Sequence, residues 1–460
     1  MTKLFGTNGI RGVVNEDMNI ELAQGIGKAW GTYLKQTVTK PKLAIGTDAR
    51  LSNEMLKTAI SAGLMATGCD VVDVGLVPTP TLQYTVKEKK FDSGVIITAS
   101  HNPPKFNGIK GVAADGTEFS KIQEEAIETI YFNQSYNLAP WDKVGQLSQW
   151  DKANELYLDS IISTVDADLI KKQQFHVVLD CGNGAGCANA PNLLEKLGCK
   201  TTKLNCEFDG LFSGRNSEPL EENLTDLIKK VSEVKADIGI AQDGDADRAI
   251  FIDEKGKYLI GDKTLALAAK LITKEKKGGV TVTPVTTSSC FTDVVKENGG
   301  KVIYTAVGSP IVARVMIEQN AVFGGEENGG LIFPELQYCR DSAMSIAKML
   351  EFIAKEQTTL SNLISGIPEY ALFKMKMKCP HHKKEIVMNK LVENVSDSKD
   401  VIRVDETDGV KLYVEGGWVL MRPSGTEPIF RVYSESKSKD TAKQLAYKYK
   451  EIVENIISSL

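Results

Sequence analysis

Residues 64–75 read LMATGCDVVDVG, which joins the apolar end of a helix to a strand-like run through a single glycine. The same design recurs in LLEKLGCKTTKLN at residues 193–205 and in VVKENGGKVIYTAVG at residues 294–308. Glycine at such a junction fits the left-handed residue that closes many helices. The junction glycines are Gly68, Gly198 and Gly299. The sequence therefore predicts three copies of one helix–glycine–strand unit.

Each copy is followed by a second strand-like run and then by a loop rich in polar side chains. The runs are SGVIIT (93–98), ADIGIA (236–241) and NAVFG (320–324), and they lead to loops around Ser100, Asp243 and Glu326. Strands that alternate with helices are typical of α/β domains with parallel or mixed sheets. Such sheets bind ligands in loops at the carboxyl ends of their strands. We therefore expect three similar α/β domains with mixed sheets, each with one functional loop.

The residues after 370 follow a different pattern, with short strand-like runs such as KLYVEG and WVLMRP and few helical stretches between them. Residues 439–458 then form a long amphipathic pattern that predicts a final helix. We expect a separate C-terminal α+β domain. The predicted domains are residues 1–150, 151–255, 256–370 and 371–460.

The amino-acid composition indicates which kinds of binding partner and which cellular location to expect. The 460 residues are 42% hydrophobic and 25% charged, and the formal net charge is -5. No Lys/Arg block stands out, so a nucleic-acid partner is not expected. No apolar run of about 18 residues occurs, so no membrane span is expected. Eight cysteines without a CxxC pair predict reduced thiols in a cytoplasmic protein.

The loop TASHNPPKFNGIK (98–110) contains the first candidate for chemistry. A strand delivers Thr98, and the two prolines that follow prevent a helix, so Ser100 is predicted on a constrained, exposed turn. A lone serine is a weak nucleophile, but a phosphorylated serine is a phosphoryl donor. His101 and Lys110 can stabilise that group or move protons. Alone, the loop is equally consistent with a turn of small polar residues.

The loop DGDADR (243–248) carries three carboxylates at alternate positions on a turn between two strand-like runs. Asp243, Asp245 and Asp247 can converge on a hard cation, because Mg²⁺ prefers oxygen ligands. With only four histidines in the chain, an oxygen site is also the expected kind. An EF-hand is disfavoured because Arg248 stands where that loop needs glycine. An aspartyl-nucleophile phosphatase loop and a solvated acidic turn remain alternatives.

Two later loops suit a sugar phosphate. GGEENGG (324–330) offers Glu326 and Asn328 to sugar hydroxyls between flexible glycines, although a plain glycine-rich turn is equally consistent. RPSGTEPIFR (422–431) has an arginine at each end of a turn of small residues, which is typical of a phosphate cradle. The alternative is a turn that begins with Pro423, flanked by two unrelated surface arginines. The residues of the predicted cradle are Arg422, Ser424, Gly425, Thr426 and Arg431.

Two weaker signals remain. GTNGIRG (6–12) brings Arg11 out of a glycine-rich turn. CGNGAG (181–186) follows a strand-like run but lacks the spacing of a dinucleotide loop, and we interpret it as a structural turn.

Together, TASHNP, DGDADR, GGEENGG and RPSGTEP, in this order, resemble the α-D-phosphohexomutase family over essentially the whole chain. The resemblance implies four domains around a central cleft. It also implies a phosphohexomutase that interconverts hexose 1-phosphate and hexose 6-phosphate through a phosphoserine and a hexose 1,6-bisphosphate, which also acts as activator. The sugar would be glucosamine, mannose or glucose.

The resemblance assigns roles to individual residues. Ser100 would carry the phosphoryl group and complete an Mg²⁺ site with Asp243, Asp245 and Asp247. Catalytic roles would fall to Arg11, His101, Lys110 and Arg248. Substrate binding would fall to Glu326, Asn328, Arg422, Ser424, Gly425, Thr426 and Arg431.

One departure and two rival functions accompany this hypothesis. Many family members carry serine where Asn328 stands and histidine where Gly330 stands, so sugar selectivity is not inferred. A metal-dependent sugar phosphatase or phosphotransferase using the same serine predicts net phosphate release. A sugar-phosphate-binding regulator predicts that Ser100→Ala leaves binding and role intact.

Overall fold

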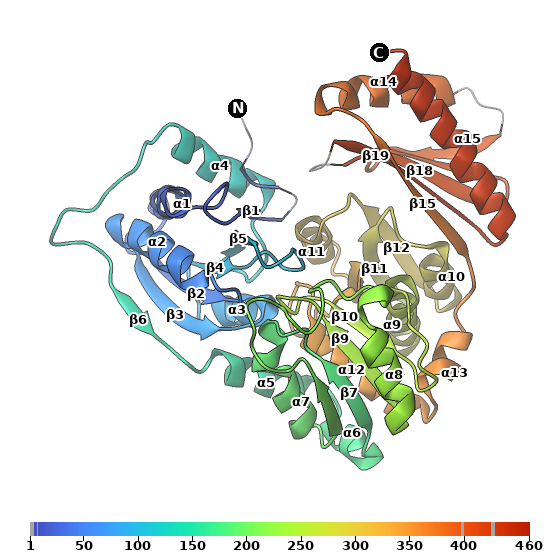
Figure 1. The fold of residues 1–460 in the computed structure, drawn as a ribbon, viewed down its shortest axis with the longest axis horizontal. Coiled ribbons are helices and arrows are strands. Elements are labelled where there is room, and N and C mark those ends of the chain that lie inside the picture. Colours follow the sequence, from blue (N-terminus) through green and yellow to red (C-terminus); the bar gives the residue numbers. More distant parts are fainter. Residues whose placement is uncertain (1–3, 7, 397–399, 425–427) are drawn as a thin grey trace. The chain divides into compact units, whose positions relative to one another are not determined.

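The computed structural model describes residues 4–6, 8–396, 400–424 and 428–460. The chain divides into two compact units. The first contains Met1–Thr264 and Asn328–Ile364, and the second contains Leu265–Glu327 and Ser365–Leu460. Most elements of both units are labelled in Figure 1.

The first unit begins with a six-stranded mixed sheet. Its order is β1 (Ile10–Val13), β5 (Phe106–Ala113), β4 (Ser93–Ile97), β2 (Lys42–Thr47), β3 (Asp70–Leu76) and β6 (Leu147–Gln149). β2 runs parallel to β3 and β4, and β3 runs parallel to β6. β5 runs antiparallel to β4 and β1. The ends of β4 and β5 therefore hold the loop of residues 98–105, here called the Ser100 loop.

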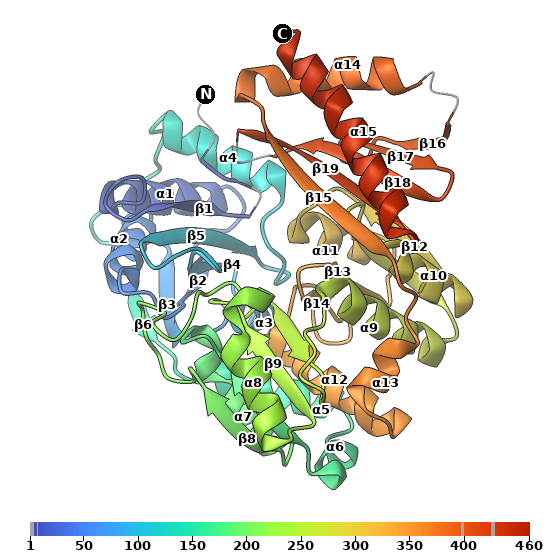
Figure 2. The ribbon, with the colours of Figure 1, turned by 45° about the vertical axis from the view of Figure 1, so that its right-hand side comes forward.

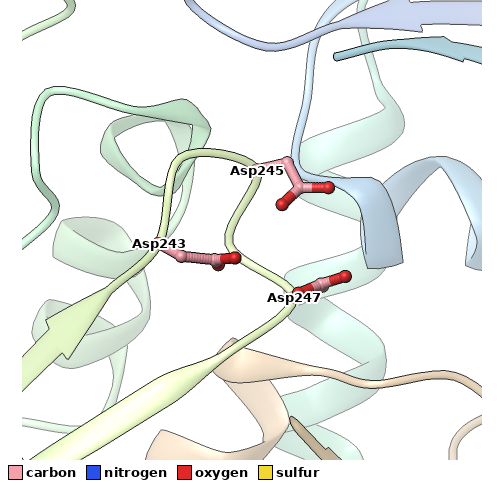
Figure 3. Close-up of side chains that lie close together, drawn as sticks. All are labelled: Asp243, Asp245 and Asp247. Carbon is pink, nitrogen blue, oxygen red and sulfur yellow. The ribbon is translucent and has the colours of Figure 1, made fainter. Parts of the chain in front are cut away.

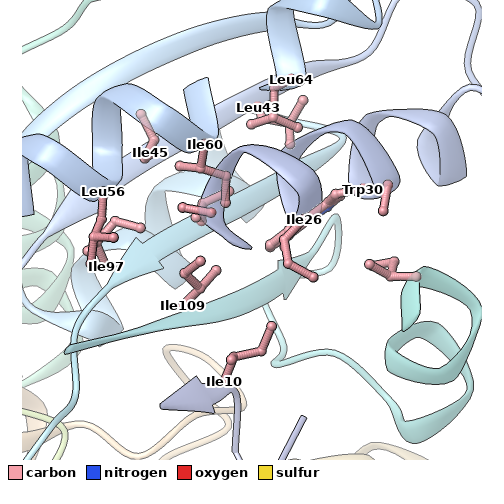
Figure 4. Close-up of a cluster of buried hydrophobic side chains, with 14 of the residues drawn as sticks. Ile10, Ile26, Trp30, Leu43, Ile45, Leu56, Ile60, Leu64, Ile97 and Ile109 are labelled. Carbon is pink, nitrogen blue, oxygen red and sulfur yellow. The ribbon is translucent and has the colours of Figure 1, made fainter. Parts of the chain in front are cut away.

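A buried apolar cluster fills the space between this sheet and its helices (Figure 4). The helices are α1 (Ile20–Leu34), α2 (Asn53–Ala66) and α4 (Lys121–Phe132), while α3 (Thr79–Glu88) packs in a second cluster. Trp30 of α1 and Ile60 of α2 are both fully buried. Burial of such side chains stabilises the domain by about 1.5–3 kcal/mol each.

Helices α1 and α2 approach each other backbone to backbone. A Cβ atom at Gly27 would overlap the carbonyl oxygen of Ile60, and one at Gly63 would overlap that of Gln24. Reciprocal glycines of this kind permit a helix contact that no larger residue allows. This contact fixes both helices over the sheet.

The next sheet of the first unit has the order β10 (Ala249–Ile252), β9 (Ile238–Gln242), β7 (His176–Asp180) and β8 (Lys200–Leu204). β7 is parallel to β8 and β9, and β10 is antiparallel to β9. The β9–β10 connection, residues 243–248, is here called the metal loop, after the cation site that its sequence predicts. Its surrounding helices are α5 (Ala153–Thr164), α6 (Ala167–Gln173), α7 (Ala190–Lys196) and α8 (Thr225–Val234).

The chain returns to the first unit with β14 (Gly330–Ile332), α12 (Ser342–Glu356) and α13 (Leu360–Ser365). α12 packs against α5, α6 and β10. The segment between β14 and α12 thereby comes to lie beside the metal loop, which the sequence pattern did not predict.

The second unit contains an α/β part and an antiparallel part. In the first part, β11 (Gly279–Pro284) lies parallel to β12 (Gly300–Thr305) and β13 (Phe323–Glu326). Its helices are α10 (Ser289–Glu297), α11 (Ser309–Glu318) and most of α9 (Gly261–Lys276).

The antiparallel part is a five-stranded sheet with two helices on one face (Figure 2). The order is β15 (Ala371–Lys378), β19 (Ile429–Ser436), β18 (Gly417–Pro423), β17 (Val410–Val414) and β16 (Val401–Asp405). The helices are α14 (Lys384–Ser396) and α15 (Lys439–Ser458). The predicted C-terminal α+β domain and its last helix are confirmed, whereas α14 was not predicted.

The three junction glycines have the expected conformation. Gly68, Gly198 and Gly299 have φ values of 93°, 71° and 74°. All eight cysteines carry free thiols, five of them buried. Within the residues that the structure describes, no helix is long and apolar enough to cross a membrane.

Candidate active site

Ser100 follows β4, separated from it by Thr98 and Ala99, and has a left-handed conformation with φ of 53°. Its backbone N–H donates to Thr98 Oγ1 at 2.8 Å. The prediction of a constrained turn is confirmed, but that of an exposed turn is wrong, because Ser100 is fully buried. The physical reason is the metal loop, where a Cβ at Gly244 would overlap the carbonyl oxygen of Ser100. The two loops therefore pack directly on each other.

Arg50 anchors the Ser100 loop through hydrogen bonds to its backbone. Its guanidinium donates to four backbone carbonyl oxygens, at 2.6–2.9 Å, which belong to Ser100, Asn102, Pro103 and Phe106. Asp48 pairs with the same guanidinium at 3.1 Å. Burial raises the pKa of Asp48, although Arg50 and Thr98 oppose that rise. A buried ion pair thus fixes the backbone around Ser100.

The metal loop gathers three carboxylates at one point (Figure 3). Oxygen atoms of Asp243, Asp245 and Asp247 lie within 4.8 Å of one another, and all three side chains are buried. This burial excludes the solvated acidic turn that the sequence left open. The strands on both sides of the loop also exclude an EF-hand, which is flanked by helices.

Cations surround these carboxylates. Lys110 of β5 donates to Asp245 Oδ2 at 2.6 Å and lies 3.7 Å from Asp247 Oδ2. Arg248 Nε lies 3.7 Å from Asp243 Oδ2 and 3.6 Å from Asp247 Oδ1. Arg340 donates to Asp247 Oδ2. These cations offset part of the repulsion among three buried negative charges.

The carboxyl groups differ in how well the protein compensates them. Burial, followed by the charges of Asp247 and Asp245, raises the pKa of Asp243 well above its ordinary value. Burial also acts to raise the pKa of Asp245, but Lys110 and the Thr79 hydroxyl outweigh it and hold that pKa below its ordinary value. A cation bound at this point would therefore stabilise the ionised form of Asp243.

The donor set fits a divalent metal ion. Asp245 Oδ1 and Asp247 Oδ1 are buried and accept no hydrogen bond from any described residue. Orphaned buried carboxylate oxygens are costly unless a cation meets them. Three such carboxylates close together can hold a hard metal ion.

Ser100 and His101 complete the centre. The Ser100 hydroxyl donates to Asp243 Oδ2 at 3.2 Å and lies 3.3 Å from His101 Nδ1. Burial, with the charges of Arg248 and Arg11, lowers the pKa of His101 to about 2, so the imidazole is neutral among these residues. Arg11 Nη1 donates to the side chain of Asn102 at 2.8 Å, which places its guanidinium beside the same loop.

The boundary between the two units falls within the sequence of the glycine-rich loop 324–330. Glu326 is buried at the end of β13 in the second unit, and Asn328 belongs to the first unit. Asn328 Oδ1 accepts from the backbone N–H of Gly330 at 3.2 Å.

In the second unit, Arg422 of β18 and Arg431 of β19 are directly opposite each other across the sheet. Like charges in this position repel unless an anion or carboxylate separates them. Arg422 pairs with Asp408 at 2.9 Å, and Arg431 lies 3.4 Å from Ser424 Oγ. Gly425 and Thr426, the other predicted cradle residues, lie outside the described residues.

Sequence reasoning missed four residues of the first-unit centre, namely Asp48, Arg50, Thr79 and Arg340. Thr79 donates its hydroxyl to Asp245 Oδ2 at 2.7 Å from the first turn of α3. The loop CGNGAG also supports the centre, because Ala185 N–H donates to the Gly244 carbonyl at 2.9 Å. The stretch TDAR (47–50), at the end of a buried strand, was a usable signal for Asp48 and Arg50, whereas no local motif marked Thr79 or Arg340.

Comparison with known families agrees with this geometry. Residues 2–138, 155–256 and 260–370 match alpha/beta/alpha domains I, II and III of the phosphoglucomutase/phosphomannomutase family, and residues 375–451 match its C-terminal domain. The chain belongs to this family.

Similar proteins name its activity class. The chain is 45% identical to a phosphoglucomutase/phosphomannomutase of Thermococcus kodakarensis, over 96% of this chain and 97% of that protein. It is 40% identical to a probable phosphoglucosamine mutase of Methanopyrus kandleri over the full length of both. A solved family structure from Burkholderia thailandensis is 26% identical with a TM-score of 0.88, covering 98% of this chain and 97% of that one. The chain is thus a phosphohexomutase, a phosphotransferring isomerase.

Proposed function

We propose that this phosphohexomutase interconverts hexose 1-phosphates and hexose 6-phosphates through phosphorylated Ser100 and a hexose 1,6-bisphosphate. The observation that carries the proposal is the approach of Ser100 Oγ to Asp243 Oδ2 at 3.2 Å within a buried cluster of carboxylates. The candidate phosphoryl carrier, the Ser100 hydroxyl, therefore lies beside the candidate metal site. Bisphosphate is the proposed activator because it can phosphorylate Ser100.

We propose Mg²⁺ as the metal, held by Asp243, Asp245, Asp247 and an oxygen of phosphorylated Ser100. All-oxygen ligands favour this hard cation. When bound, it neutralises charge on the phosphoryl oxygens. The protein supplies the same kind of stabilisation from Arg11 and Arg248, whose guanidinium groups suit phosphoryl oxygens.

Each transfer moves one phosphoryl group and one proton. The bond from phosphorus to Ser100 Oγ breaks as a bond to the free sugar hydroxyl forms, and the proton of that hydroxyl ends on Ser100 Oγ. Return of the other phosphoryl group regenerates the phosphoserine. We propose that His101 exchanges the proton at Ser100 Oγ, since its Nδ1 lies 3.3 Å away. Lys110 is engaged with Asp245 and serves charge compensation.

Substrate binding is proposed for the remaining predicted residues. Glu326 and Asn328 are proposed to contact sugar hydroxyls. The phosphate that is not being transferred is proposed to bind the cradle Arg422, Ser424, Gly425, Thr426 and Arg431. The arginines that face each other on β18 and β19 support this assignment because guanidinium groups bind phosphate oxygens. A cytoplasmic location is also proposed, and the eight free thiols support it.

A coupled assay tests the function directly. Glucose, mannose and glucosamine 1-phosphates are each supplied with Mg²⁺ and a trace of hexose bisphosphate. Ser100→Ala should lower the isomerisation rate by about 10³-fold or more and remove the phosphoryl group seen by intact mass. Ser61→Ala, a buried serine of α2 outside the centre, is the matched control and should keep full activity.

Two results would contradict the proposal. One is no isomerisation of any of the three sugars by the unmodified enzyme. The other is release of inorganic phosphate as fast as substrate is consumed, which is the behaviour of a phosphatase.

A further inference from the structure

Arg340 is a buried arginine of the first unit that lies outside every recognised motif. It stands between β14 and α12, and its Nη2 donates to Asp247 Oδ2. This bond leaves Asp247 Oδ1 buried and without a hydrogen bond among the described residues. The guanidinium therefore fixes the carboxylate so that its other oxygen is available to a cation.

The backbone that carries Arg340 is itself anchored to the metal loop. Ser342 Oγ donates to the Ala246 carbonyl at 2.6 Å and accepts from Gln242 Nε2 at 2.7 Å. Asp341 N–H donates to the Leu331 carbonyl at 3.0 Å. The two residues that follow Arg340 are thus fixed by hydrogen bonds, which holds Arg340 next to Asp247.

Gly330 provides the space that the Arg340 side chain crosses. A Cβ atom at Gly330 would overlap Arg340 Cδ and lie 2.8 Å from Arg340 Cγ. These are middle atoms of a side chain whose far end is bound to Asp247, so they cannot move aside while the ion pair stays intact. A side chain at position 330 and an arginine at position 340 therefore compete for one volume.

We infer that Arg340 and Gly330 form a matched pair that positions Asp247 in the phosphoryl-transfer centre, Arg340 by binding the carboxylate and Gly330 by leaving room for the arginine. The inference rests on the proposed function. It makes Arg340 a positioning residue, and it accounts for the glycine at position 330. Lys110 and Arg248 remain at 3.7 and 3.6 Å from Asp247 and do not replace the shorter Arg340 contact.

A double-mutant cycle tests the pairing. Arg340→Ala and Gly330→Ala should each lower kcat about 10–100-fold with the KM for hexose phosphate changed less than about threefold. The double variant should be no slower than Arg340→Ala, because both changes remove the same bond. Arg340→Lys keeps the positive charge but lacks the planar guanidinium group, so its kcat should lie between those of Arg340→Ala and the unmodified enzyme. Independent, multiplicative losses would overturn the pairing.

Binding of Mg²⁺ alone supplies a readout that needs no turnover. The rise of the thermal midpoint with Mg²⁺ concentration gives the half-saturating concentration for each variant. Loss of positioning should raise that concentration about 10–100-fold in Arg340→Ala and Gly330→Ala. If Arg340 only repelled the cation as a neighbouring positive charge, its removal would lower the concentration, and that result would overturn the inference.

A matched control separates positioning from general damage. A Cβ at Gly25 in α1 would lie 2.6 Å from Tyr131 Cε2, a comparable conflict outside the centre. Gly25→Ala should lower the thermal midpoint yet leave kcat and half-saturating Mg²⁺ unchanged. An unmodified enzyme that isomerises no hexose phosphate contradicts the proposed function, whereas an active enzyme with unaffected position-340 variants contradicts only this inference.

Discussion

Arg50 shows how one side chain can hold a reactive loop without touching the reacting atoms. Its four bonds to backbone carbonyls and its ion pair with Asp48 fix the Ser100 loop. Arg50→Lys keeps the charge but cannot reach four acceptors, so we expect a loss of about 2–3 kcal/mol in stability and about a tenfold fall in kcat.

The measurement is thermal unfolding together with steady-state kinetics. Arg403→Lys is the control, since Arg403 is an exposed arginine that stacks on Tyr413 in the second unit. Equal kcat for Arg50→Lys and the unmodified enzyme would show that the loop keeps its geometry without the guanidinium.

Glu124 in α4 gives the enzyme a predicted pH dependence of stability. Burial, with opposition from Lys121 and help from Glu118 and Glu128, raises its pKa from 4.5 to about 8. The folded state therefore holds this proton more tightly than the unfolded state. The contribution is most favourable below pH 4.5 and is lost as the pH rises through 8.

Glu124→Gln removes this titration. The variant should match the unmodified enzyme at pH 5 within experimental error and exceed its stability at pH 9 by about 2 kcal/mol. Thermal midpoints at both pH values provide the measurement, and Glu125→Gln, an exposed neighbour, is the control. A gain that is equal at both pH values would contradict the assignment to Glu124 ionisation.

At the scale of elements, the α1–α2 contact reverses the usual effect of alanine in a helix. Alanine normally stabilises a helix by about 1 kcal/mol relative to glycine. A methyl group at Gly63, however, would overlap the Gln24 carbonyl and lie 3.0 Å from the Lys28 nitrogen. We expect Gly63→Ala to destabilise the first unit by about 2–4 kcal/mol, because backbone atoms cannot yield. A higher thermal midpoint in the variant would contradict this packing.

Most helices and strands could be predicted from local sequence patterns, and the exceptions have physical reasons. The junction glycines and the apolar strands near them were predictable because a left-handed residue and a buried run leave local signals. Helix α14 was missed because its fully buried apolar side chains are few, Val387 and Leu391 among them. The predicted exposure of Ser100 failed because burial there depends on Gly244, which lies far along the chain.

At the scale of the whole molecule, motif order was enough to predict the family and the class of reaction. The mixed sheets and the C-terminal α+β part are confirmed, while the domain limits near 150, 255 and 370 and the roles of the site residues stay predictions. Arg340 and Thr79 were beyond sequence reasoning because a lone arginine or threonine carries no local signature. Only tertiary packing brings them to the metal loop.

The packing of the Ser100 loop on the metal loop also has a consequence for the time course of folding. Ser100 meets Asp243 across 143 residues of chain, Lys110 meets Asp245 across 135, and Asp247 meets Arg340 across 93. Contacts between such distant segments form slowly, because long stretches of chain must be ordered first. Catalytic competence should therefore be among the last properties that a newly made chain acquires, after the separate sheets have formed.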